Sequence, residues 1–369
     1  MRPGPGRQTD RMEPYRIDVP DGVLDDLRAR LAITRWPVAA TGVGWDRGTD
    51  PDFLRELLNQ WRTAYDWRRH EAELNELPHF KAGGVHFVHQ QARGGIPLLL
   101  LHGWPDSFLR FVRVLPLLAD HPVVVPSLPG YGFSDPPPVG RASRQAMADR
   151  VAGLMAALGY DRYVVSGGDV GGGVAEHLAL THPDRVAGLH LTNLALWRAA
   201  AIDPADLSPL ERDFLAAVQD WQRREGGYLQ LQSTKPMTAA YGLADSPAGL
   251  AGWLTEKFRS WSDDFAASFP PDELLTHLTL YWVTNTIGSS FGPYVERPPG
   301  DPGRVTVPTA VSVFPGEPVR AAPRELAERF FAISLWTEHD RGGHFAALEV
   351  PDLFAGDLLA FLSGVVDRS

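Results

Sequence analysis

Apolar and polar positions follow two different patterns along the chain. In the first eighty or so residues, apolar positions recur three or four apart, as at Leu24, Leu27 and Leu31, with charged residues between them. This spacing is typical of helices that bury one face. We therefore expect residues 1–82 to form a helical extension that packs on the main domain.

From residue 85 onward, short apolar runs alternate with amphipathic segments. A parallel sheet requires this alternation, because each strand must be followed by a helix that returns the chain across the sheet. The pattern therefore predicts an α/β fold. The first apolar run is 85–89, and the expected strands are 98–101, 122–126, 163–166, 186–192, 305–314 and 332–336. The expected helices are 144–158, 172–181, 324–331 and 353–365.

The alternation stops between about residues 197 and 300, where aromatic residues, prolines and helical stretches take its place. Such an insertion after a central strand indicates a lid, which covers the active end of the sheet and lines the substrate pocket. The chain is thus predicted to have four segments. They are the extension 1–82, a first core part 83–196, the lid 197–300 and a second core part 301–369.

One short segment, Gly167-Gly168-Asp169-Val170-Gly171, lies between an expected strand and an expected helix. It fits the G-x-S-x-G elbow, a sharp turn that exposes a nucleophile at the end of the sheet, with aspartate in place of serine. An aspartate, with an ordinary pKa of about 3.9, is anionic at neutral pH without the help of a base. A carboxylate nucleophile suits substitution at strained or activated carbon. Esterase and peptidase chemistry are therefore disfavoured.

The turn from His102 to Pro105 follows the expected strand 98–101. Folds with such an elbow supply one backbone N–H of an oxyanion hole at this point, and the residue after the nucleophile supplies the other. Trp104 and Val170 are thus predicted to stabilise the oxyanion that forms when water attacks an ester of Asp169. The alternative is a tight turn that only buries an aromatic side chain.

A glycine turn after the last expected strand carries His344, in the chain order nucleophile, acid, histidine. We predict that His344 takes a proton from water, so that hydroxide can attack the ester. The other histidines, among them His86, His89 and His177, are expected to lie on the surface or in the packing.

The acid that orients the histidine is predicted to be Glu317, just past the strand 305–314. The alternative is a solvated loop glutamate. Asp340 and Glu338 are closer to the histidine in sequence, but closeness in sequence is a poor guide to the geometry of a triad. Asn193, after the preceding strand, is a more distant second choice.

Together these motifs resemble those of the microsomal epoxide hydrolase family. The matching segments are 15–20, 102–105, 167–169, 224–236 and 342–347, so the similarity extends over nearly the whole chain. The resemblance implies an α/β-hydrolase fold with a mostly parallel, eight-stranded sheet. It also implies hydrolysis of an epoxide to a vicinal diol through an ester of Asp169, with no cofactor and no metal. The family's acid, a glutamate in a Phe-Pro-x-Glu context, falls on Glu317.

The family's two lid tyrosines fall on Tyr228 and Tyr294, and the resemblance implies that they protonate the epoxide. Opening an epoxide leaves an alkoxide, and a phenol of pKa about 10 can hydrogen-bond the ring oxygen and then protonate it. Without the resemblance, both tyrosines would be interpreted as core residues. Tyr241 and Tyr281 are the alternatives.

Two residues depart from the family pattern. Val170 stands where the family commonly has tryptophan, which retains the backbone N–H but makes the pocket wall smaller. Asp106 replaces the small residue that usually follows the His-Gly-Trp-Pro turn. The N-terminus also lacks the hydrophobic anchor of the mammalian members, so we expect a soluble, cytoplasmic protein.

Composition narrows the possible partners. The formal charge is −10 and no basic run interrupts it, which argues against nucleic acid and anionic membranes. The chain has no cysteine, so disulfides, thiolate catalysis and cysteine-ligated metals are excluded. The expected ligands are water and a small hydrophobic or aryl epoxide. The sequence does not determine the oligomeric state, for which a homodimer is one option.

Two rival functions remain. A haloalkane or haloacid dehalogenase shares the fold and the aspartate nucleophile, but it often binds the departing halide through a tryptophan N–H in the place of Val170. A non-catalytic hydrolase-fold protein that only binds a hydrophobic ligand is the other rival. The presence of a nucleophile, an acid and a base argues against it.

Overall fold

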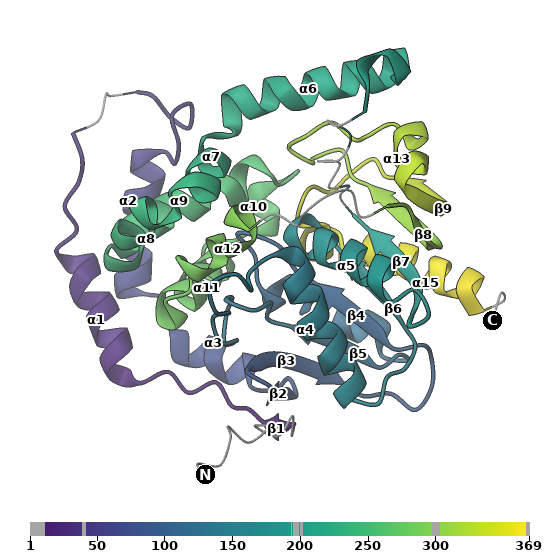
Figure 1. Cartoon of the computed structure of the whole chain (residues 1–369). Coiled ribbons are helices and arrows are strands. Elements are labelled where there is room, and N and C mark those ends of the chain that lie inside the picture. The colour runs from purple at the N-terminus through teal and green to yellow at the C-terminus, as the bar shows by residue number, and fades with distance from the viewer. Residues whose placement is uncertain are drawn as a thin grey trace, which may run out of the picture.

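A large sheet forms the centre of the molecule (Figure 1). The computed structural model describes residues 12–38, 42–192, 194, 199, 202–296 and 303–366. Within these residues the sheet has nine strands in the order β1-β2-β3-β5-β4-β6-β7-β8-β9. The strands are Glu13–Pro14 (β1), His79–Ala82 (β2), Val85–Gln90 (β3), Leu98–Leu101 (β4), Val123–Pro126 (β5), Tyr163–Gly167 (β6), Val186–Leu191 (β7), Val305–Val313 (β8) and Phe331–Glu338 (β9).

Most of the sheet is parallel. In sheet order, neighbouring strands from β5 through β4, β6, β7 and β8 to β9 pair in parallel. Strands β1, β2 and β3 add an antiparallel part at one edge. The predicted α/β fold with a mostly parallel sheet is therefore confirmed. The sheet has nine strands rather than eight. Strands β1 and β2 both lie in the segment that the sequence predicts to be helical, and β1 has two exposed residues and so leaves no apolar run in the sequence.

The N-terminal segment combines helices with sheet edge. It contains the helices Asp21–Ala32 (α1), Pro51–Thr63 (α2) and Trp67–Leu74 (α3), and also the strands β1 and β2. The periodic leucines of α1 are buried, as their spacing predicts. Helix α2 contacts the lid, where Trp61 Nε1 donates to Thr279 Oγ1 over 2.9 Å. The division of the chain into four segments stays a prediction.

The helices of the core pack on the two faces of the sheet. Figure 1 shows α4 and α5 side by side in front of the strands and α15 behind them. Helix α5 begins three residues earlier than predicted, because Gly172 N already donates to Gly168 O over 2.9 Å. The core helices are Arg144–Ala157 (α4), Asp169–Thr181 (α5), Arg324–Phe330 (α13), Ala346–Glu349 (α14) and Pro351–Val366 (α15).

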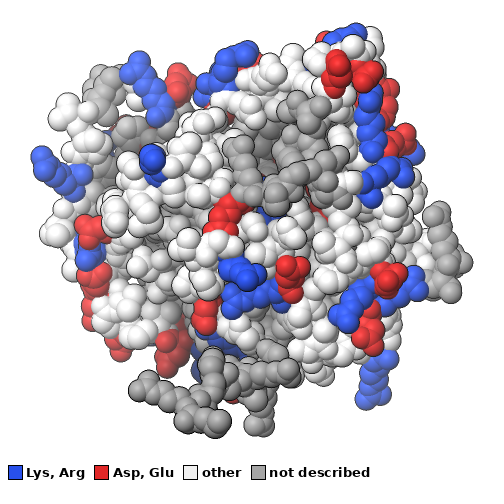
Figure 2. Space-filling model, viewed as in Figure 1, with Lys and Arg blue, Asp and Glu red and all other residues white. Residues whose placement is uncertain are grey.

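The segment predicted to be a lid lies between β7 and β8 in the sequence and covers one end of the sheet (Figure 1). No helix among the described residues is long and apolar enough to span a bilayer. On the face shown in Figure 2, basic and acidic side chains lie in mixed groups around a broad uncharged area. The lid helices are Pro209–Glu225 (α6), Gly227–Thr234 (α7), Pro236–Asp245 (α8), Pro247–Ser260 (α9), Phe265–Ser268 (α10), Pro271–Thr284 (α11) and Gly292–Val295 (α12).

Candidate active site

The elbow between β6 and α5 presents Asp169 at the carboxyl end of the parallel strands. Asp169 has a φ of 53°, in the left-handed region that residues with a side chain seldom adopt. The turn is tight: a Cβ on Gly171 would lie 2.2 Å from the carbonyl oxygen of Leu101. Only glycine fits at that position, so the sequence fixes both the sharpness of the turn and the direction of the carboxylate.

The turn after β4 holds one oxygen of this carboxylate. Trp104 N donates to Asp169 Oδ1 over 2.9 Å. Val170 is the second residue of α5, and N–H groups in a first helical turn have no acceptor within the helix. The two backbone donors that the sequence predicts for an oxyanion hole thus flank the nucleophile.

The dyad of His344 and Glu317 forms as predicted from the chain order. Nδ1 of the imidazole donates to Glu317 Oε2 over 3.0 Å, and the buried Nε2 has no hydrogen-bond partner among the described residues. Burial lowers the pKa of His344. The charge of Glu317 and its hydrogen bond outweigh that effect, so the pKa lies above its ordinary value. Nε2 can therefore accept a proton while Glu317 stabilises the resulting cation.

The two predicted lid tyrosines lie against the turn from His102 to Pro105, which is called the oxyanion turn below. The ring of Trp104 stacks on Tyr228, with centroids 5.3 Å apart, and meets Tyr294 edge-on at 6.1 Å. Burial raises the pKa of both phenols, and the nearby Asp169 carboxylate raises it further. Both phenols therefore favour the protonated form beside the Asp169 carboxylate. The Tyr294 hydroxyl has no hydrogen-bond partner among the described residues.

Comparison with known proteins identifies the family to which the chain belongs. The family profile "Epoxide hydrolase N terminus" matches residues 12–111, and the profile "alpha/beta hydrolase fold" matches residues 96–272. A Stigmatella aurantiaca protein, provisionally named an epoxide hydrolase, is 41% identical over 94% of this chain and 83% of its own length. The chain belongs to the epoxide hydrolase family. The predicted resemblance, fold and enzyme class are confirmed.

Further relatives of this epoxide hydrolase match over nearly its whole length. Epoxide hydrolase 1 of Sus scrofa is 31% identical over 97% of this chain and 91% of its own. The structure of Aspergillus niger epoxide hydrolase has a TM-score of 0.85 at 30% identity and covers 95% of this chain and 96% of that one. The juvenile hormone epoxide hydrolase of Bombyx mori has a TM-score of 0.87 at 30% identity, over 98% and 96%. The enzyme thus hydrolyses epoxides with water.

The alternative tyrosines of this epoxide hydrolase are placed differently from Tyr228 and Tyr294. Tyr241 is 71% exposed on α8. Tyr281 is buried, and its hydroxyl donates to the carbonyl oxygen of Asp106 over 3.1 Å. Neither tyrosine occupies a position like those of Tyr228 and Tyr294, whose rings pack against the Trp104 ring.

The alternative acids are also placed away from the histidine. Glu338 and Asp340 are exposed at the end of β9, where Glu338 accepts from Trp336 Nε1. Asn193 lies outside the described residues. Among the described residues, no group of three or more His, Cys, Asp or Glu side chains could hold a metal ion.

Three of the other histidines make polar contacts inside the protein. His86 lies between His79 and Ser127, at 3.0 Å and 2.9 Å. His89 contacts the hydroxyl of Tyr160, and His177 contacts Gly173 O. All three are buried, so the expectation of packing holds and that of a surface position does not.

The loop that carries His344 is hydrogen-bonded to the predicted lid. His344 N donates to Trp261 O over 2.9 Å. The Glu349 carboxylate accepts from Phe345 N at 2.9 Å and from Asp263 N at 2.8 Å. Burial raises the pKa of Glu349 to about 7, although both N–H donors act against it. His344 is therefore positioned by the predicted lid as well as by the core.

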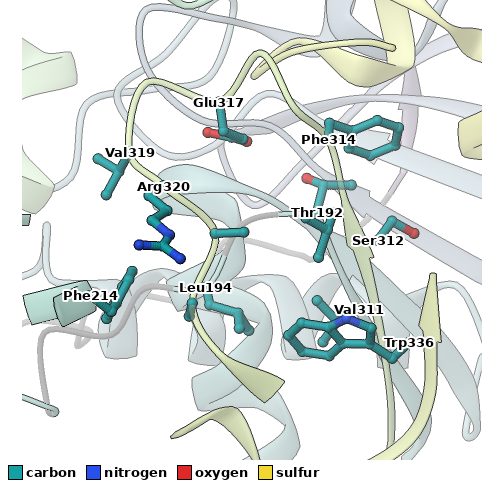
Figure 3. A pocket seen from close by; sticks show the side chains of 13 residues that line it. Thr192, Leu194, Phe214, Val311, Ser312, Phe314, Glu317, Val319, Arg320 and Trp336 are labelled. Atoms are coloured by element: carbon teal, nitrogen blue, oxygen red, sulfur yellow. The ribbon is translucent and has the colours of Figure 1, made fainter. Parts of the chain in front are cut away.

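A small cavity lined in part by Glu317 lies at the carboxyl ends of β7 and β8 (Figure 3). Its volume of about 50 Å³ is far below the several hundred Å³ of typical substrate pockets, although it suffices for a few water molecules. Neither Asp169 nor His344 lines it. The cavity is thus distinct from the place where an epoxide must meet the nucleophile.

Sequence reasoning missed one pair of residues beside the site. The sequence marks Asp106 only as a departure from the family pattern and gives Arg110 no predicted role. Both side chains are buried next to the histidine loop, and they form an ion pair. Their spacing of four residues within one motif was the available signal.

Proposed function

We propose that this epoxide hydrolase opens its substrate by attack of the Asp169 carboxylate on a ring carbon. Trp104 N–H holds Oδ1, which leaves Oδ2 as the attacking oxygen. As the new C–O bond forms, the ring C–O bond breaks and its electron pair goes to the ring oxygen. That oxygen takes a proton from Tyr228 or Tyr294. The product is a glycol ester of Asp169 and a tyrosinate.

Water then hydrolyses the ester. His344, oriented by Glu317, takes one proton from water, and the hydroxide attacks the ester carbonyl. The oxyanion develops on Oδ1, where Trp104 N–H and Val170 N–H stabilise it. The tetrahedral intermediate releases the glycol, so one water proton ends on the glycol oxygen and the other restores the tyrosine. The net reaction is epoxide plus water to vicinal diol.

One observation carries this proposal: Trp104 N–H already binds the Asp169 carboxylate, while His344 Nε2 has no hydrogen-bond partner in the part of the chain that the structure describes. A carboxylate needs no base for the first step, so a base beside it serves the second. The arrangement therefore supports two half-reactions, in which Asp169 acts first and His344 second.

The aromatic walls support a hydrophobic or aryl epoxide as the substrate. The Trp104 ring contacts Trp261 at 6.1 Å and Phe291 at 6.3 Å, in addition to the two tyrosines. Aromatic surfaces of this kind bind apolar and π-rich groups and leave few partners for a charged substituent. An aryl epoxide is therefore expected to have a higher kcat/KM than a short aliphatic epoxide.

A single turnover in ¹⁸O water tests the covalent mechanism. With enzyme in excess over epoxide, water oxygen should enter the Asp169 carboxylate and not the diol, because the ester breaks at its acyl carbon. Mass spectrometry of the peptide with Asp169 should show one ¹⁸O. Label in the diol and none on Asp169 would indicate direct attack by water and would refute the proposal.

A further inference from the structure

An ion pair between Asp106 and Arg110 lies inside the protein beside the proposed site. The two side chains are 0% and 2% exposed, and Arg110 Nε donates to Asp106 Oδ2. Burying two charges is costly, and their mutual attraction repays the cost only if further hydrogen bonds satisfy the remaining atoms. These further contacts reach the proposed catalytic residues.

Arg110 connects the elbow with the histidine loop. Its Nη2 donates to the carbonyl oxygen of His344 over 2.9 Å. Its Nη1 lies 3.2 Å from the point that a Cβ on Gly168, the residue before the nucleophile, would occupy. The guanidinium also lies 5.6 Å from the centre of the Phe345 ring. Because the guanidinium is planar and has several donors in fixed directions, it is suited to hold the elbow and the histidine loop in one geometry.

Asp106 connects the same arginine with the oxyanion turn. It follows Pro105 directly, two residues after Trp104. Its Oδ1 accepts from the backbone N–H of Ser107 over 2.7 Å, and its carbonyl oxygen accepts from the hydroxyl of Tyr281 on α11. The ion pair thus joins the oxyanion turn, the elbow and the loop of the base.

We propose that Asp106 and Arg110 are positioning residues that fix the backbone of His344 relative to Asp169 and Trp104 for hydrolysis of the ester. This inference rests on the proposed function. Attack on the epoxide needs Asp169 and the lid tyrosines, whereas hydrolysis needs His344 aligned with the ester carbonyl. A displaced His344 loop therefore slows the second half-reaction more than the first.

Arg110→Met tests the inference through steady-state kinetics. A misplacement of about 1 Å can cost on the order of a hundredfold in rate, so kcat should fall by that order. When only ester hydrolysis slows, kcat and KM fall together and kcat/KM stays unchanged. The ester on Asp169 should accumulate in rapid-quench mass spectrometry. Arg110→Lys, which keeps a charge and a donor, should recover part of kcat.

The pH profile provides a second readout. Four groups act on the His344 imidazole: Glu317 and Asp169 raise its pKa, Arg110 lowers it, and Glu349 lies nearby on α14. Because hydrolysis requires the neutral imidazole, loss of the Arg110 cation should move the acid limb of kcat to higher pH. The lysine variant should move it back. A purely structural role for the arginine predicts no such directed shift.

Arg113→Met is the matched control. Arg113 also donates to a backbone carbonyl after the histidine loop, Leu348 O at 2.8 Å, and pairs with Glu273 at 2.6 Å, but it contacts none of the proposed catalytic groups. Its kcat, KM and acid limb should match the wild type. If Arg110→Met does not fold, Asp106→Asn is the second variant, because it keeps the side-chain shape and removes the partner charge. It should show the same joint fall in kcat and KM.

The outcomes separate the inference from the proposed function. The inference is overturned if the Arg110 and Asp106 variants lower kcat and kcat/KM equally, accumulate no ester and keep the wild-type acid limb, while His344→Gln accumulates ester. If His344→Gln accumulates none either, the proposed covalent mechanism itself has failed.

Discussion

The two oxygens of the Asp169 carboxylate have different surroundings, and under the proposed mechanism this difference separates their tasks. Oδ1 accepts the Trp104 N–H at 2.9 Å, and Oδ2 attacks the epoxide. In the ester Oδ1 becomes the carbonyl oxygen, so the oxyanion of the second step develops where a donor already lies. Donors placed before the charge develops need no reorganisation during the reaction.

Replacing Tyr228 or Tyr294 with phenylalanine should slow the opening of the epoxide ring, because each change removes a phenol that protonates the ring oxygen. We expect each single variant to slow ester formation by about tenfold or more, and the double variant by about 10²- to 10⁴-fold. Rapid-quench measurement of the ester checks this. Tyr241→Phe is the control and should match the wild type, since Tyr241 is 71% exposed. An unimpaired double variant would disprove the role of the tyrosines.

Strand ends made part of the site predictable from sequence. Asp169, His344 and Glu317 each follow an expected strand, and the carboxyl ends of parallel strands meet at one edge of a sheet. Tyr228 and Tyr294 lie in a lid whose sequence has no strand-helix rhythm, so only the family resemblance indicated them. The four-residue spacing of Asp106 and Arg110 is also that of an ordinary surface ion pair, and their burial depends on distant segments of the chain.

At the scale of elements, apolar runs predicted the strands β4 to β7 well because those strands are buried on both faces. The observed element bounds differ from the predicted ones where backbone hydrogen bonds, rather than the pattern of apolar and polar residues, determine them. Helix α5 starts at Asp169, within a run of glycines that sequence reasoning assigned to the turn. Strand β1 exists because Tyr15 N donates to His79 O and extends the edge pairing, a contact that no local pattern shows.

The carboxyl group of Glu349 on α14 should make the free energy of unfolding depend on pH. Burial raises the pKa of Glu349 from 4.5 to about 7. Between these values the folded protein holds a proton that the unfolded chain has released, so the stability that Glu349 contributes falls as pH rises through this window. The unfolding free energy of the wild type minus that of Glu349→Gln should therefore decrease from about pH 5 to about pH 8 in urea titrations. A difference that is constant with pH would contradict the shift.

At the scale of the whole molecule, the N-terminal helices brace the lid from outside. Besides the Trp61 bond to α11, Thr49 Oγ1 donates to Gly252 O on α9 over 2.7 Å, and Arg69 pairs with Asp272 at 2.6 Å. The sequence predicted that this segment packs on the main domain, but its contacts with the lid join residues some two hundred positions apart. Such pairings leave no local pattern. The N-terminal segment thus supports α9 and α11 of the predicted lid.

His344→Gln tests the central claim most directly, because it should permit the first half-reaction and block the second. The variant is incubated with an aryl epoxide, and the intact protein and its Asp169 peptide are weighed by mass spectrometry, with Asp169→Asn as the control. The account predicts an adduct of the epoxide's mass on Asp169, approaching one per chain, with little diol released and no adduct in the control. An unmodified Asp169, or an adduct that persists in Asp169→Asn, would contradict it.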